Sequence, residues 1–128
     1  MVFDVATFVA ELHRILKPNG SLLVAAPFVG MWGSPTFTDM WRFTPLGLQR
    51  LLNQSFGSEN VTVRAYGNSL TSAGNLRGLV IGEFTRAELD YCDWRFALEV
   101  CAHAVKPPSH FNPNRRSWPR PRSIHTQS

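Results

Sequence analysis

The residues best suited to binding chemistry lie in one strongly aromatic segment of the chain. Asp39, Trp41 and Arg42 stand close together in it, and Phe28 and Trp32 precede them. An arginine guanidinium can hold a carboxylate or phosphate through paired hydrogen bonds, and a carboxylate can orient a ligand or accept a proton. Aromatic side chains can form the walls of such a site. We therefore predict a substrate pocket lined by these five residues; the alternative is an Asp39–Arg42 ion pair that only fixes the loop.

The cysteines and histidines follow no spacing that indicates a metal or catalytic site. Cys92 and Cys101 stand nine positions apart, which matches neither a redox pair nor a zinc pattern. His13 and His103 have no sequence neighbour at ligand or triad spacing. We expect ordinary thiols, structural histidines and no metal site, and the pattern identifies no catalytic residue.

A helix, a tight turn and a strand precede the aromatic segment. Apolar residues recur at intervals of three and four over residues 5–16, and Asp4 can cap this helix at its start. Residues 21–26 form a short apolar run before Pro27. Such a run is typical of a strand buried on both faces of a parallel sheet. The first part of the chain therefore predicts an αβ unit.

Further elements follow the aromatic segment. Thr44-Pro45 predicts the start of a second helix, and polar and apolar residues alternate over 60–66 as in a half-buried strand. Residues 69–87 indicate a weak helix with a glycine at every fourth position, a stripe that permits close packing. Residues 96–105 predict a third strand with alternate residues on one side.

The first unit carries a resemblance to a known family. Its sequence over residues 11–24, ELHRILKPNGSLLV, resembles the late αβ unit of class I S-adenosylmethionine-dependent methyltransferases, where E-x-x-R-x-L-K-P-G-G runs into a buried strand. DMWRFTPLGL (39–48), Tyr66-Gly67-Asn68 and AVKP (104–107) are similar to the branch often called methyltransferase type 11. The resemblance spans nearly all of residues 4–107. It departs at Asn19, where the family usually has glycine, but asparagine tolerates the left-handed conformation.

The resemblance implies an α/β fold and a place in a larger domain. The chain would be a partial doubly wound, Rossmann-like sheet, the C-terminal half with strands in the family order 5-7-6 and flanking helices. It would contribute the acceptor-substrate side of a methyltransferase site. The family binds S-adenosylmethionine on a glycine-rich loop, whereas no two glycines here are separated by a single residue. We expect no tight cofactor binding by this chain alone, and its activity as an enzyme stays open.

If the chain is only the C-terminal half of such a sheet, it should pair with another chain. Without the other half, the strand between Leu22 and Ala26 would be an open edge, which favours a homo-oligomer, a complementing chain or aggregation. The alternative function is a non-enzymatic interaction module that uses this edge and a basic tail. A truncated reading frame would also explain the missing half, and the small-molecule acceptor is unknown.

The basic charge is concentrated at the end of the chain. The net charge is +4, but residues 1–107 hold nine basic and nine acidic residues, and four arginines follow. Residues 108–128 are predicted to be a disordered basic Pro/Arg-rich tail after a partial α/β domain over 1–107. Nucleic-acid binding is expected only weakly, through this tail. No apolar run reaches the roughly 18 residues of a membrane span, and no signal peptide is visible, so a cytoplasmic protein is expected.

Overall fold

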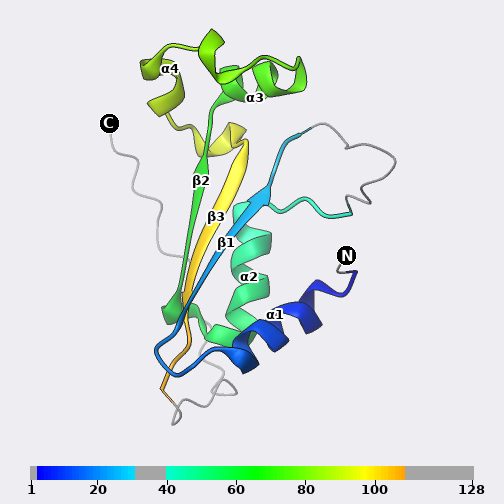
Figure 1. The fold of residues 1–128 in the computed structure, drawn as a ribbon, viewed down its shortest axis with the longest axis vertical. Helices are drawn as coiled ribbons and strands as arrows, with labels where there is room; N and C mark the ends of the chain where they lie inside the picture. Colours follow the sequence, from blue (N-terminus) through cyan, green and yellow to red (C-terminus); the bar gives the residue numbers. More distant parts are fainter. Residues whose placement is uncertain (1–2, 31–39, 109–128) are drawn as a thin grey trace.

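The computed structural model describes residues 3–30 and 40–108 (Figure 1). These residues form a mixed α/β fold, which confirms the coarse fold prediction. Its helices and strands are α1 (Val5–Ile15), β1 (Ser21–Pro27), α2 (Pro45–Phe56), β2 (Val61–Tyr66), α3 (Ser69–Leu76), α4 (Arg86–Asp90) and β3 (Glu99–Val105). Three short 3-10 turns join them, at Ser58–Asn60, Ile81–Glu83 and Trp94–Phe96. Figure 1 shows α2 running along the sheet with α1 beside it, and α3 and α4 beyond the end of β2.

The three strands form one sheet in the order β1-β3-β2. β3 is antiparallel to both neighbours, so β1 and β2 run in the same direction. The register places Leu23, His103 and Thr62 in one row across the sheet. Among the described strands, β1 therefore lies at one edge and β2 at the other.

The hydrophobic core lies between the sheet and the two long helices. Leu52 and Phe56 on α2 are fully buried, and so are Val100 and Ala104 on β3. Val9 of α1 completes the cluster from the side of the first helix. The apolar stripes of both helices thus face the same side of the sheet, as helical periodicity requires.

The prediction that residues 21–26 are buried on both faces of a parallel sheet is wrong. The described partner of β1 is the antiparallel strand β3, and exposure alternates along β1. Leu23 is 78% exposed, whereas Leu22 and Val24 pack against the core. The reason is that the described helices α1 and α2 cover one face of this sheet, so every second residue of the apolar run lies on the face without a described helical layer.

Local capping explains where the two long helices begin. The Asp4 carboxylate accepts a hydrogen bond from Thr7 N at 3.0 Å, and the Thr44 hydroxyl accepts one from Gly47 N at 3.0 Å. Both N-caps were predicted from the sequence and are confirmed. Asn19 adopts the left-handed conformation with φ 62°, which confirms the predicted turn before β1.

The side chain of Lys106, the residue after β3, caps the C-terminal end of α1. Lys106 Nζ donates to the carbonyl oxygens of His13 and Leu16, each at 2.8 Å. It also lies 3.3 Å from the carbonyl oxygen of Arg14. These carbonyls have no partner within the last turn of a helix, so the ammonium group satisfies them.

The single helix predicted over residues 69–87 is wrong. α3 ends at Leu76, and Gly78 adopts a positive φ of 76° that a continuing helix does not allow. A Cβ at Gly74 would overlap the Phe84 ring, whereas Gly78 and Gly82 have open space beside them. The three glycines therefore form no common packing stripe.

The third strand begins later than predicted, at Glu99. Phe96 lies in a 3-10 turn and is 49% exposed. Two backbone hydrogen bonds close the segment before the strand: Asp93 N donates to Gly67 O, and Leu98 N donates to Tyr66 O, both at 2.8 Å. The chain thus leaves the sheet at the end of β2 and returns beside the same point.

Candidate functional site

The candidate site lies at the end of the sheet where β1 and β2 finish. Open α/β sheets bind ligands beyond the carboxyl ends of their parallel strands. Phe28 N donates to Leu98 O at 3.1 Å, and Phe43 N donates to Pro27 O at 3.1 Å. These two bonds hold both ends of the aromatic loop against the end of β1. Phe28 and Phe43 also pack against the core, so this part of the site has a rigid base.

The structure describes three of the five predicted pocket residues. Phe28, Trp41 and Arg42 are described, whereas Trp32 and Asp39 lie outside the described residues. The ion pair considered between Asp39 and Arg42 therefore lies outside them as well. Phe28 is half-buried and packs against the core, while Trp41 and Arg42 are exposed.

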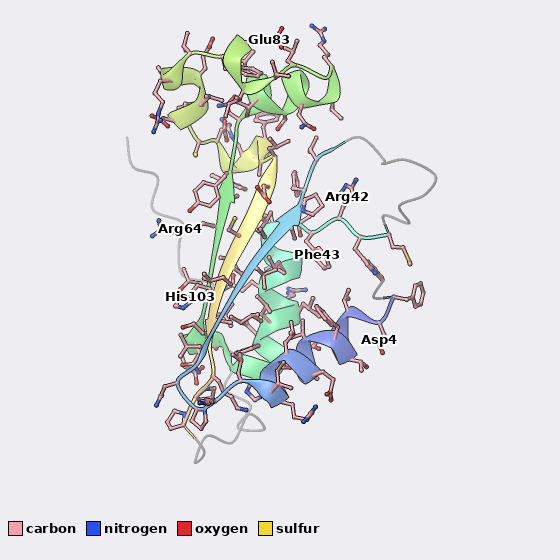
Figure 2. The ribbon with its side chains drawn as sticks, in the orientation of Figure 1. Asp4, Arg42, Phe43, Arg64, Glu83 and His103 are labelled. Atoms are coloured by element: carbon pink, nitrogen blue, oxygen red, sulfur yellow. The ribbon has the colours of Figure 1, made fainter. Side chains whose placement is uncertain are left out.

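Arg42 lies where the loop after β1 approaches α3. Figure 2 shows it beside the end of β1 together with Phe43. Its Nη1 donates to the carbonyl oxygen of Trp41 at 3.1 Å. Its Nη2 and the Asn75 Oδ1 each lie 4.0 Å from the position that a Cβ would take on Gly30. The site thus brings a guanidinium and an amide from α3 to one glycine of the loop.

Asn75 is a site residue that the sequence analysis did not identify. It is 33 positions after Arg42, and no local spacing connects the two. Its side chain belongs to the last turn of α3, and the chain must turn at the end of β2 before the amide can face the loop. Only the tertiary arrangement places this hydrogen-bonding group beside Arg42.

Among the described residues, Trp41 belongs to an aromatic row with Phe3 and Phe43. Its ring lies 6.4 Å from the Phe43 ring, at an interplanar angle of 29°, and 6.1 Å from the Phe3 ring. Trp41 is 40% exposed. The row connects the start of α1 to the loop before α2, and it offers an apolar surface next to a cation. Phe3 was not predicted as a neighbour of this site.

A separate hollow of about 360 Å³ lies between α3 and α4, bordered by Asn68, Leu70 and Tyr91. Two of its polar residues, Asn68 and Glu88, already have partners in the fold. The Asn68 amide donates to the carbonyl oxygens of Glu88 and Tyr91 at 2.8 and 2.7 Å. Hydrogen bonds from Thr85 lower the pKa of Glu88, which caps α4. Asn68 and Glu88 therefore stabilise the fold at this hollow.

Cys101 and His103 lie on β3, and Cys92 is an exposed free thiol. Burial raises the pKa of the Cys101 thiol, with a smaller contribution from Glu99, so the thiol stays protonated at neutral pH. His103 Nε2 lies 3.0 Å from the Ser21 hydroxyl on the outer face of the sheet. Within residues 3–30 and 40–108, no group of three or more His, Cys, Asp or Glu side chains is placed to hold a metal ion.

Comparisons of this chain with protein families, with curated proteins and with solved structures found no match. Over the described parts of the chain, every helix is too short or too polar to cross a membrane.

Proposed function

We propose that this chain is the C-terminal half of a class I S-adenosylmethionine-dependent methyltransferase domain and supplies the acceptor-substrate side of its site. The strand order β1-β3-β2 carries the proposal. It is the order that strands 5, 6 and 7 of the family would have when arranged 5-7-6. Within the family-like segment 11–24, Asn19 keeps the left-handed turn although it replaces the usual glycine, and Thr44 caps the following helix, so both features are consistent with the resemblance.

The proposed role of the site is to position the methyl acceptor. Arg42 would hold a carboxylate or phosphate on the acceptor, with Trp41 as an apolar wall and Asn75 as a further hydrogen-bonding group. Trp32 and Asp39 remain predicted members of the same pocket. Methyl transfer depends on this positioning because the sulfonium of the methyl donor already carries a good leaving group.

The cofactor does not fit this chain by itself. The glycine-rich loop that would approach it is missing, since no G-x-G sequence occurs. We therefore derive no reaction step from this chain alone and assign it the acceptor side only.

The test begins with the sequence of the transcript and genomic region upstream of Met1. The proposal expects an in-frame segment that carries G-x-G and ends in a strand. The longer product should bind S-adenosylmethionine in calorimetry, and the present chain should not. Stop codons directly before a genuine start, or low-micromolar binding by the present chain alone, would overturn the proposal.

The role of Arg42 can be tested in that longer product. Arg42→Gln should raise the KM of the acceptor at least about tenfold, because a charge-assisted pair contributes about 1.5–3 kcal/mol. Arg50→Gln on α2 is the matched control, since Arg50 is exposed on a helix away from the loop. An equal change in both variants would contradict a role for Arg42 in acceptor binding.

A second candidate is a non-enzymatic interaction module that uses the edge of the sheet and the basic tail. The position of β1 at an edge, with no charged side chain on the strand, favours it. Deletion of residues 108–128 separates its two parts. Loss of partner or RNA binding would assign binding to the tail, and retained binding would assign it to the edge.

A further inference from the structure

The outer edge of β1 exposes a defined set of backbone groups. Lys106 N donates to Gly20 O at 2.8 Å at one end of the β1–β3 ladder, and Phe28 N donates to Leu98 O at 3.1 Å at the other. In an antiparallel pair, hydrogen-bonded and non-hydrogen-bonded positions alternate. The even-numbered residues of β1 therefore bond to β3, and the odd-numbered ones direct their N–H and C=O groups outward.

The open part of this edge is limited to three residues. Pro27 has no N–H, and its outward carbonyl already accepts the hydrogen bond from Phe43 N at 3.1 Å. Counting partners within residues 3–30 and 40–108 only, Ser21, Leu23 and Ala25 remain, each with one donor and one acceptor. Because the three are evenly spaced about Leu23, the edge is complementary to itself when a second strand runs antiparallel to it.

We propose that a second copy of this chain pairs antiparallel with β1 about a two-fold axis at Leu23. Leu23 then lies opposite its counterpart, and Ser21 lies opposite Ala25 at both ends. Each hydrogen-bonded pair exchanges two bonds, so about six intermolecular hydrogen bonds satisfy every open group of the edge. The result is a continuous six-stranded sheet with an isologous interface.

The side chains of β1 favour the same arrangement. Leu23 is 78% exposed on the uncovered face, and pairing with its counterpart buries part of that surface. Its cross-strand neighbours Ser21 and Ala25 are small, so they leave room for both leucines. On the covered face, half-buried Leu22 would lie opposite Val24 of the second copy and extend the core.

The other edge of the sheet is less suited to pairing. β2 carries Arg64 in the middle of the strand, and its side chain is exposed (Figure 2). Charged side chains on an edge strand disfavour the addition of another strand. β1 has no charge over its seven residues, and its proline stands at the end already occupied by Phe43. The pairing is therefore expected at β1 alone.

This inference does not rest on the methyltransferase proposal, and the two can fail separately. A missing N-terminal half would compete for the same edge, so its addition would dissociate the dimer. The mass of the isolated chain tests whether two copies form a dimer. Cofactor binding by a longer product tests the proposed function.

The experiment measures the mass of the full chain by light scattering after size exclusion, at concentrations of about 1–100 μM. We expect twice the chain mass of 14.4 kDa. Leu23→Lys should weaken the dimer at least tenfold, because two ammonium groups would meet at the axis. Thr62→Lys is the matched control: Thr62 lies in the same row of the same face, but on β2, and this variant should remain a dimer.

A monomeric wild-type chain would overturn the inference. A Leu23→Lys variant that stays dimeric, or a Thr62→Lys variant that dissociates equally, would also overturn it, since the contact would then lie elsewhere. If Leu23→Lys does not fold by circular dichroism, oxidative cross-linking replaces it. In a Cys92→Ser background, Leu23→Cys should form a covalent dimer and Thr62→Cys should not, because paired Cα atoms at the axis lie about 5.5 Å apart. Equal cross-linking of both would reject the axis at Leu23.

Discussion

The two faces of the sheet differ in what their strands contribute to stability. On the face toward α2, Val100 and Ala104 of β3 have no exposed surface. On the other face, Leu23 is 78% exposed and Tyr66 46% exposed, and Figure 2 shows Arg64 and His103 directed away from α2. Neighbouring residues of one strand therefore make very different contributions, because only one face has a helical layer.

The largest expected effect on the free energy of unfolding comes from removing a buried side chain on the face of the sheet that α2 covers. Leu52→Ala removes a side chain with no exposed surface from the middle of α2. It should lower the free energy of unfolding by about 2–5 kcal/mol in urea denaturation, since the removed atoms leave a cavity. Leu23→Ala, on the uncovered face, should change it by less than about 0.5 kcal/mol when both variants are measured at chain concentrations below the dissociation constant of the proposed dimer. Equal losses would show that both faces are buried in solution.

A smaller effect is expected at the end of α1. Lys106→Met removes the Nζ that donates to the carbonyl oxygens of His13 and Leu16 but keeps much of the aliphatic stem. The free energy of unfolding should fall by about 1–2 kcal/mol, because part-buried carbonyls lose a charged donor. Lys17→Met changes an exposed lysine near the same helix end and should have little effect. Similar losses in both variants would attribute the effect to net charge.

The smallest effect is a pH dependence that arises on the covered side. His13 Nε2 is buried with no hydrogen-bond partner in the described parts of the chain, and the ring meets Phe56 edge-on at 4.8 Å. Burial, together with the charge of Lys106, lowers the pKa of His13 below its ordinary 6.5. The unfolded chain then binds the proton more readily, so the free energy of unfolding should fall as pH drops through and below 6.5.

Urea denaturation at pH 7.5 and at pH 5 measures this dependence. His13→Leu removes the titrating group and keeps an apolar contact with Phe56, so it should reduce the loss of stability on acidification. An unchanged loss in the variant would assign the dependence to other groups.

The sequence predicted those parts of the fold that local chemistry determines. Asp4 and Thr44 cap helices through side-chain oxygens three positions from their donors, and Asn19 provides a left-handed turn. The exposure of Leu23 was not predicted, because an apolar run does not reveal which face receives helices. Residues 69–87 were assigned to one helix because the regular glycine spacing does not reveal that Gly78 takes a positive φ and ends the helical path after Leu76.

The candidate site was predicted less completely than the fold. Arg42 and Trp41 were identified from residue type and from their place after a strand, and both lie at the sheet end. Asn75 and Phe3 were missed, since each reaches the site through the tertiary fold. The role of these residues in binding an acceptor remains a proposal.

The closure of the chain beside Tyr66 and Gly67 has an evolutionary consequence. Because Leu98 N and Asp93 N bond back to these two residues, the excursion between them starts and finishes at one place. Its ends are already held by the sheet, so a change in its length alters the closure entropy only slowly. This position is a natural insertion point, at which the segment between Gly67 and Asp93 can be lengthened or replaced while the strands keep their register.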